Sequence, residues 1–191
     1  MWGIDLKAGM ELRPWAGCLQ RLATTPDQAQ SLLAQAVTEL DRRAALLAET
    51  GHRQWTPTPD TPALVILIDE YAELGEPARQ HADSLARRGR AVAVTLLAAT
   101  QRPTQAAMGH GATRSQMDAR ICLRVRERRD TDLILGQGAH TAGWHAVHAA
   151  VEALPPLTDE HNLTRHHHPG ARIPTGARAP AHHLYTTYHC T

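Results

Sequence analysis

Two unbroken apolar runs near the middle of the chain predict buried β-strands. The first is Ala-Leu-Val-Ile-Leu-Ile at 63–68, and the second is Ala-Val-Ala-Val-Thr-Leu-Leu-Ala at 91–98. Continuous apolar runs of this length are typical of central parallel strands that are buried on both faces. A shorter run, Gly-Ile-Asp-Leu-Lys at 3–7, predicts a further strand. We therefore expect a sheet with these runs at its centre.

A long amphipathic helix is predicted between Thr25 and Gly51. Thr25 suits the N-cap, Pro26 the first helical position, and Gln28 completes a capping-box pattern. Apolar residues then recur every three or four positions: Leu32, Leu33, Ala36, Val37, Leu40, Ala44, Leu47 and Ala48. This spacing places them on one helical face, which we expect to cover one face of the sheet.

A second helix is predicted from Glu76 to Arg88, closed by Gly89, after a proline-rich loop at 56–62. Helices that alternate with apolar strands indicate an α/β fold with right-handed crossovers. In such folds ligands bind at the carboxyl ends of the strands. The residues that follow the two apolar runs are therefore the first places to look for chemistry.

The pattern is weaker after residue 115. Alternation over 119–126 sets Ile121, Leu123 and Val125 against polar neighbours, which favours a half-exposed edge strand. The run 127–130 is interpreted as a polar loop that caps a short helix at Asp130. Gly136 follows apolar residues instead of opening a helix, so it favours a helix end over a phosphate-binding loop.

Composition narrows the class of protein. The 191 residues, 42% of them hydrophobic, suit one domain of ordinary size. A net charge of +1 gives no overall basic field, so any contact with DNA must come from local patches. Three cysteines without C-x-x-C spacing favour a reducing, cytoplasmic compartment. No apolar run reaches the roughly 18 residues of a membrane span, and we expect no signal peptide.

Candidate chemistry follows both apolar runs. Asp69 and Glu70 end the first run, as in the Walker B design, where one acid holds Mg²⁺ through its water shell and the next deprotonates the attacking water. Thr100 and Gln101 end the second run and suit a sensor beside the same phosphate. The phosphate-binding pattern G-x-x-x-x-G-K-[ST] does not occur in these 191 residues. The sequence thus holds half of a nucleotide-hydrolysing site.

Five separated blocks appear in an order that resembles the FtsK/SpoIIIE DNA translocases, in particular their actinobacterial conjugative-transfer branch. The resemblance covers roughly residues 3–147. The opening 4–7 (Ile-Asp-Leu-Lys) resembles the strand that follows the Walker A helix in that family. The blocks are Ile-Leu-Ile-Asp-Glu-Tyr-Ala-Glu-Leu at 66–74, Ala-Arg-Arg-Gly-Arg-Ala at 86–91, Leu-Ala-Ala-Thr-Gln-Arg-Pro at 97–103, Ala-Arg-Ile-Cys-Leu-Arg-Val at 119–125 and Ile-Leu-Gly-Gln-Gly-Ala at 134–139.

The resemblance implies a partial RecA-like P-loop NTPase core at 1–147, with a mostly parallel sheet flanked by helices. The stretch 148–191, rich in proline, histidine and arginine, departs from the family, and we expect it to be an irregular tail. It implies ATP and Mg²⁺ as cofactors in the context of the complete motor. Five residues receive roles by resemblance: Asp69 binds Mg²⁺ through water, Glu70 is the catalytic base, Thr100 and Gln101 contact the nucleotide or the attacking water, and Arg90 reaches the neighbouring subunit's nucleotide.

The same resemblance implies a ring of six subunits around double-stranded DNA. The loop at 104–114 then faces the pore, and four arginines are candidates for sequence-independent, salt-sensitive phosphate contacts: Arg114, Arg120, Arg124 and Arg126. Simpler interpretations stay open. Arg90 is equally explained as a solvated arginine near a helix end. Arginines that alternate along an edge strand are equally explained by exposure to water.

Two classes of function remain from the sequence. The first is a fragment of an ATP-driven double-stranded DNA translocase, of conjugative transfer or chromosome segregation, inactive as an isolated chain because the phosphate loop is missing. The alternative is a non-catalytic remnant or accessory module that binds DNA or a complete motor. Other ring ATPases of the superfamily explain the Thr-Gln-Arg-Pro and Leu-Gly-Gln-Gly blocks less well.

Histidines gather in the tail, with seven at or beyond His161. Imidazole clusters bind zinc or nickel, but the adjacent histidines at 166–168 fit no closed structural site, and the proline- and glycine-rich surroundings favour disorder. We also expect a strand completing the sheet beyond residue 147, and no proline-bounded strand appears there. A change of reading frame near 147–154 or a lineage-specific extension explains this departure.

Overall fold

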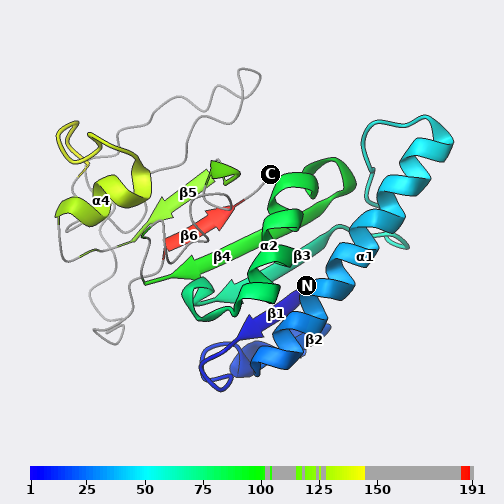
Figure 1. The fold of residues 1–191 in the computed structure, drawn as a ribbon, viewed down its shortest axis with the longest axis horizontal. Helices are drawn as coiled ribbons and strands as arrows, with labels where there is room; N and C mark the ends of the chain where they lie inside the picture. The colour runs from blue at the N-terminus through cyan, green and yellow to red at the C-terminus, as the bar shows by residue number, and fades with distance from the viewer. Residues whose placement is uncertain are drawn as a thin grey trace.

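The computed structural model describes residues 1–101, 104, 115–117, 119–123, 125, 128–144 and 186–189. Within these residues, six strands form a single sheet in the order β2-β1-β3-β4-β6-β5 (Figure 1). Strands β2, β1, β3 and β4 run parallel, whereas β6 is antiparallel to both of its neighbours. The bounds are Trp2–Asp5 for β1, Arg21–Ala23 for β2, Leu64–Asp69 for β3, Val94–Thr100 for β4, Ala119–Cys122 for β5 and Thr186–His189 for β6.

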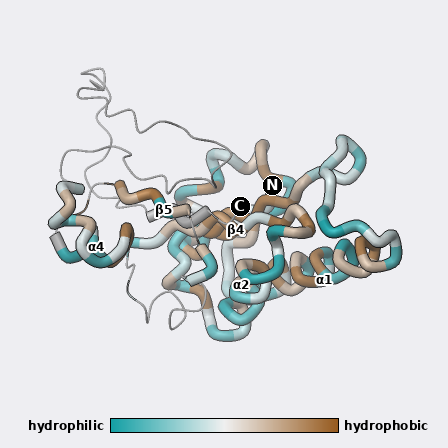
Figure 2. Tube along the Cα trace, turned by 90° about the horizontal axis from the view of Figure 1, so that it is seen from above, coloured by the Kyte–Doolittle hydropathy of each residue, from teal (hydrophilic) through white to brown (hydrophobic). Residues whose placement is uncertain are grey.

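Two long helices, α1 (Pro26–Thr50) and α2 (Glu76–Arg88), cover one face of this sheet. Both lie on the same side of β4, with the hydrophobic strands above them (Figure 2). A short helix, α4 (Arg128–Leu135), lies beyond β5 (Figure 1). Three 3₁₀ turns complete the described elements: η1 at Arg13–Cys18, η2 at Tyr71–Glu73 and η3 at Arg90–Val92.

The ends of α1 follow the sequence prediction closely. The Thr25 hydroxyl accepts a hydrogen bond from the backbone N–H of Gln28 at 3.3 Å, which is the predicted N-cap. The reciprocal bond of the capping box is shifted by one residue, because the Gln28 side chain accepts from the N–H of Thr24. Gly51, with a left-handed φ of 71°, ends the helix. The buried stripe of α1 also contains Arg43, which the pattern did not predict.

The centre of the sheet is buried on one face and half-buried on the other. In β3, Leu64, Ile66 and Ile68 are buried, whereas Val65 and Leu67 between them are only partly covered. Strand β4 shows the same alternation. The prediction of strands buried on both faces is therefore wrong for these positions. The physical reason is that α1 and α2 pack against the same face.

Strand β4 begins three residues later than predicted. Ala91 belongs to the turn η3, and Ala93 has a left-handed φ of 53°. The carbonyl of Gly89 accepts hydrogen bonds from the N–H groups of Val92 (3.1 Å) and Val94 (3.0 Å), which closes a tight turn. A Cβ atom at Gly89 would lie 2.2 Å from the Val94 carbonyl oxygen, so only glycine fits here.

The predicted alternation along β5 is wrong. Ala119 and Cys122 are buried, whereas Ile121 is only partly buried. The reason is a small second core, in which Cys122 packs with Val125 and Ile134 instead of facing water. The expected edge position of this strand is confirmed by the strand order.

The remaining C-terminal predictions have mixed outcomes. Helix α4 starts at Arg128, two residues before the predicted cap Asp130. It ends before Gly136, whose φ of 118° confirms the helix-ending role. Strand β6 lies within the tail that the sequence indicated to be irregular, so that expectation is wrong for Thr186–His189. Backbone pairing with β4 and β5 explains why: it needs no apolar pattern in the sequence.

None of the helices in the described part of the chain combines the length and the apolar character that crossing a bilayer requires.

Candidate active site

The carboxyl ends of β1, β3 and β4 bring three polar residues to one edge of the sheet. Asp5 and Asp69 are paired in the register of β1 and β3, and Thr100 ends β4 next to them. Their exposed fractions are 0%, 4% and 1%. Parallel strands end at a common edge, so the predicted meeting of the Asp69–Glu70 pair with Thr100–Gln101 is confirmed.

Asp5 shapes the loop at this edge. Its carboxylate accepts hydrogen bonds from three backbone N–H groups, those of Lys7 (3.0 Å), Glu11 (2.9 Å) and Leu12 (2.9 Å). These bonds satisfy the buried charge and fold the chain back after β1, through left-handed residues Ala8 and Gly9. The sequence pattern placed Asp5 only within a strand. The signal that could have found it is an isolated acid at the end of an apolar run.

Glu70 is held against the end of β4 by hydrogen bonds. Its Oε1 accepts from the Thr100 hydroxyl at 2.7 Å, and the Gln101 N–H lies 3.2 and 3.3 Å from its two carboxylate oxygens. The backbone of Glu70 is left-handed, with φ 56° and ψ 70°. Such a conformation costs about 1–3 kcal/mol in a non-glycine residue, and it accumulates at functional sites. The exposed Gln101 side chain takes no part in these bonds.

Lys7 places a positive charge beside the acidic pair. Its ammonium nitrogen lies 3.9 Å from Asp69 Oδ2 and 3.6 Å from Glu70 Oε2. The Lys7 side chain is 25% exposed, whereas each acid is 6% exposed. In the sequence, Lys7 stood out only as part of the resembling block 4–7, and it received no role in the site.

Asp69 carries a buried charge that is incompletely paired. Its Oδ2 atom is buried and has no hydrogen-bond partner among the described residues. Burial raises the pKa of Asp69; the charges of Asp5, Glu11 and Glu70 raise it further, and Lys7 opposes them. A divalent cation beside this oxygen would relieve the penalty.

The donor set fits Mg²⁺ better than a metal that the protein alone would cage. The described residues contain no group of three or more His, Cys, Asp or Glu arranged to hold a metal ion. Mg²⁺ is commonly bound by one or two carboxylates together with water and substrate phosphates. Asp69, whose buried Oδ2 has no hydrogen-bond partner among the described residues, is a suitable ligand of that kind.

No protein-family model matches the chain. Individual relatives do. A sporulation regulatory protein of Streptomyces azureus is 35% identical over 156 residues, covering 73% of this chain and 51% of that protein. The DNA translocase SpoIIIE of Bacillus subtilis is 29% identical over 160 residues, and the DNA translocase FtsK of Oceanobacillus iheyensis is 31% identical over 160 residues. The chain is a homologue of the FtsK/SpoIIIE DNA translocases.

The homology covers part of each protein. The aligned region is 72% of this chain but 20% of SpoIIIE and of FtsK, so the chain spans about half or less of these relatives. A solved structure, that of the pCW3 conjugation coupling protein TcpA in monomer form with ATPγS, matches 73% of this chain and 45% of that chain. The TM-score is 0.63 at 21% identity. This likeness confirms the expected fold class, a partial RecA-like core.

Arg90, which by resemblance would reach the nucleotide of a neighbouring subunit, lies far from the acidic site of its own chain. It lies exposed in η3, before β4 begins, whereas Glu70 contacts the residues at which β4 ends. A seven-residue strand separates the two positions, a length of about 20 Å. Its role in a neighbour's site stays a prediction.

The four candidate DNA contacts are only partly described. Arg120 is half-buried, and its guanidinium donates to the backbone carbonyls of Met117 (3.2 Å) and Ile134 (3.3 Å). These bonds tie β5 to α4, which is a structural role that the sequence did not indicate. A phosphate contact by Arg120 stays a prediction. Arg114, Arg124 and Arg126 lie outside the described residues.

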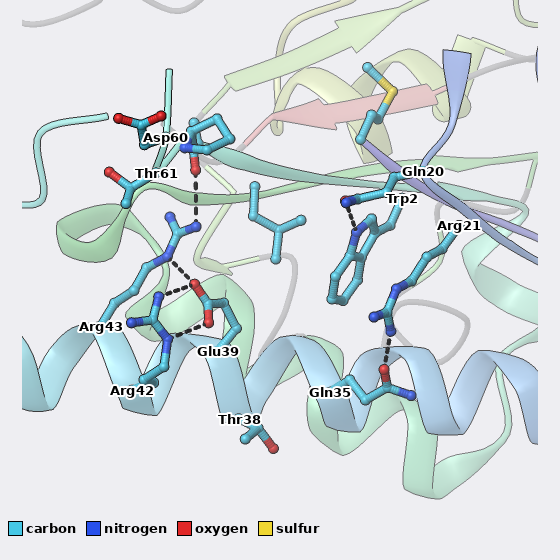
Figure 3. A pocket seen from close by; sticks show the side chains of 14 residues that line it. Trp2, Gln20, Arg21, Gln35, Thr38, Glu39, Arg42, Arg43, Asp60 and Thr61 are labelled. Atoms are coloured by element: carbon cyan, nitrogen blue, oxygen red, sulfur yellow. Dashed lines mark hydrogen bonds and ion pairs between the residues drawn. The ribbon is translucent and has the colours of Figure 1, made fainter. Parts of the chain in front are cut away.

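A hollow of about 460 Å³ lies at the opposite edge of the sheet, between α1 and the starts of β1 and β3 (Figure 3). Four of its charged side chains have partners within its lining. Arg42 and Arg43 both donate to Glu39, and Arg21 stacks on the Trp2 ring at 4.5 Å while donating to Gln35. The arginines and Glu39 of this hollow are therefore paired groups, unlike Asp69 of the acidic site.

Proposed function

We propose that this chain forms the Walker B and sensor part of an ATP-driven double-stranded DNA translocase, acting in conjugative transfer or chromosome segregation. The observation that carries the proposal is the joint arrangement at one sheet edge. Glu70 is oriented by Thr100 and Gln101, and Asp69 beside it has a buried oxygen without a hydrogen-bond partner among the described residues. Homology to translocases supports ATP and duplex DNA as the substrates.

In this proposal, the two acids have separate tasks. Asp69 would hold Mg²⁺, which when bound neutralises charge on the transferred phosphate. Glu70 would orient the attacking water and accept its proton. The Thr100 hydroxyl occupies Oε1 with a short bond, so the proton would go to the other oxygen, Oε2, whose contacts with the Gln101 N–H (3.3 Å) and the Lys7 ammonium (3.6 Å) are longer. Thr100 thus acts as a positioning residue, and it aims the carboxylate through a bond that the rigid end of β4 supplies.

The proposed site needs a phosphate-binding loop from outside these 191 residues. Three features support a larger assembly. The relatives are at least about twice as long as the region they share with this chain. The 191-residue sequence lacks the Walker A pattern. Arg90 precedes β4, whereas Glu70 contacts the end of that strand, and this separation supports a role for Arg90 in a neighbouring subunit's site over one in its own. A homo-hexameric ring and a cytoplasmic location are part of this proposal.

Duplex DNA would be bound without sequence preference in this proposal. Arg114, Arg120, Arg124 and Arg126 remain the candidate phosphate contacts. Binding that depends on arginine–phosphate pairs weakens steeply as salt rises. A steep loss of duplex binding between low and physiological salt is therefore expected from the assembled motor.

The experiment that tests the proposal restores the missing half of the site. The 191-residue chain is fused behind the phosphate-loop half of the Bacillus subtilis SpoIIIE motor, and ATP hydrolysis is measured with and without duplex DNA. We expect DNA-stimulated hydrolysis by the fusion and little or none by the 191-residue chain alone. The Glu70→Gln fusion is the matched control, and its turnover should fall by about 100-fold or more because the proton acceptor is lost.

Nucleotide binding separates the outcomes. A fusion that binds ATP but hydrolyses it no faster than its Glu70→Gln version contradicts the proposal and favours a non-catalytic accessory module. DNA-stimulated hydrolysis by the 191-residue chain alone, abolished by Glu70→Gln, would contradict the need for an external phosphate loop. Thr100→Val should reduce the turnover of the fusion less than Glu70→Gln, since it disorients the base without removing it.

A further inference from the structure

Lys7 is fixed at the mouth of the acidic site by the fold of its own loop. Its backbone N–H donates to Asp5 Oδ1 at 3.0 Å, and Asp5 is fully buried. The same carboxylate holds the loop further along, at Glu11 and Leu12. The root of the Lys7 side chain is therefore anchored. A flexible four-carbon stem then carries the ammonium to a position between the two acids.

The ammonium pairs with both acids without a close hydrogen bond to either. The distances of 3.9 Å to Asp69 and 3.6 Å to Glu70 exceed the roughly 2.7–2.9 Å of a charge-assisted hydrogen bond. Glu70 makes its short bonds elsewhere, to Thr100 and Gln101. Asp69 Oδ2 has no hydrogen-bond partner within the described residues. Lys7 thus compensates charge from a position that another cation could take over.

The carboxylates gathered at this edge carry more negative charge than the Lys7 ammonium neutralises. Asp5, Asp69 and Glu70 meet at this edge, and Glu11 also contributes to the potential at Asp69. Asp5 is satisfied by three backbone N–H groups. Among the residues that the structure describes, the ion pairs at this edge set the two carboxylates of Asp69 and Glu70 against the single ammonium of Lys7. A divalent cation that displaced the ammonium would balance the pair completely.

We propose that Lys7 is the built-in counter-ion of the Asp69–Glu70 pair and competes with the divalent cation for these carboxylates. This inference rests on the proposed function, because its ligand is the metal of the hydrolysis site. Lys7 is a positioning residue in this scheme: it keeps the acids in place before the metal arrives and lowers the affinity of the site for free metal. Removing its charge should therefore strengthen metal binding, although it removes an ion pair.

Titration of the 191-residue chain with Mn²⁺ tests this competition without any hydrolysis. Bound Mn²⁺ is measured by electron paramagnetic resonance at low ionic strength, where charge competition is not screened. We expect Lys7→Met to bind Mn²⁺ about tenfold more tightly than the wild-type chain. Lys7→Arg, which keeps the charge, should remain close to wild type. Asp69→Asn in the Lys7→Met background should lose the added affinity. Circular dichroism verifies that each variant is folded.

Each outcome decides the inference. Equal or weaker Mn²⁺ binding by folded Lys7→Met overturns the competition and assigns Lys7 a purely structural role. Tightening that persists in the Lys7→Met, Asp69→Asn double variant also overturns it, since the metal then binds elsewhere. Absence of Mn²⁺ binding in every variant overturns it too. None of these results depends on turnover by the SpoIIIE fusion, so failure of this inference and failure of the proposed function are distinguishable.

Discussion

The sheet buries charged side chains both where its parallel strands begin (the amino edge) and where they end (the carboxyl edge). The two edges differ in how completely these charges are hydrogen-bonded. At the amino edge, Arg43 is 5% exposed and its donors are used: Nε donates to Glu39, Nη1 to the carbonyls of Val92 and Ala93, and Nη2 to that of Pro62. At the carboxyl edge, Asp69 is similarly buried, yet one of its oxygens has no hydrogen-bond partner among the described residues. One charge is satisfied and the other is left open.

This difference separates a structural charge from a functional one. A buried charge that is hydrogen-bonded on all sides ties elements together, as Arg43 ties α1 to the turn before β4 and to the loop before β3. A buried charge that is left open costs stability, and proteins retain such groups where a ligand completes them. The amino edge therefore stabilises the fold, and the carboxyl edge carries the open charge on which the proposed site rests.

The largest effect is expected from Arg43→Ala at the amino edge. The substitution removes the guanidinium that donates to the carbonyls of Val92, Ala93 and Pro62, and it removes one of the two donors to Glu39 Oε1. We expect a loss of about 3 kcal/mol in the free energy of unfolding. Urea denaturation followed by circular dichroism measures it. Arg42→Ala is the matched control. Its side chain is 52% exposed and pairs with the same Glu39, so it should cost no more than about 1 kcal/mol. Equal losses in both variants would contradict the contrast.

Asp69→Asn should stabilise the folded chain, whereas Arg43→Ala should destabilise it. Burial raises the pKa of Asp69, so the folded chain binds this proton more tightly than the unfolded chain does. Stability is then lost as the pH rises from the ordinary aspartate pKa through the raised one. A neutral Asn avoids this penalty, and we expect a gain of about 1 kcal/mol near neutral pH. The gain should vanish in acid, where Asp69 is protonated. A destabilised Asp69→Asn chain near neutral pH would show that Lys7 satisfies this charge.

At the amino edge, the free energy of unfolding should fall as the pH falls, the reverse of the trend expected for Asp69. Hydrogen bonding to Arg42 is the main cause that lowers the pKa of Glu39 to about 2, with Arg43 adding to it. Its contribution to stability is therefore complete above the ordinary glutamate pKa of about 4.5 and is lost as the pH falls towards 2. After allowance for solvent screening we expect about 1 kcal/mol. Urea denaturation at a series of pH values should show this acid loss in the wild type and not in Glu39→Gln.

The sequence predicted the elements that are set by local chemistry. Thr25, Gly51 and Gly89 define the ends of the helices, because capping and left-handed backbone depend on neighbouring residues only. Predictions failed where close packing, which leaves no periodic pattern in the sequence, decides the outcome. The start of β4 is set by a turn around Gly89, and the facing of Cys122 is set by its packing against Val125 and Ile134.

The same division holds for the site. Asp69, Glu70 and Thr100 were predictable because each follows an apolar run, and the ends of parallel strands share an edge. The contribution of Lys7 to the site could not be predicted, because a lysine in a loop leaves no periodic pattern in the sequence. Only the folding of that loop around Asp5 places its ammonium beside the acids.

The sequence by itself therefore determined which residue types stand at the ends of which strands, and with them the relationship to the FtsK/SpoIIIE translocases. The tertiary structure decided which buried charges are satisfied and which are left open. That distinction depends on donors and acceptors from segments far apart in the chain, such as Arg43 with Val92, or Glu70 with Thr100. Hydrogen bonds require atoms within about 3 Å, and only the folded chain sets such distances.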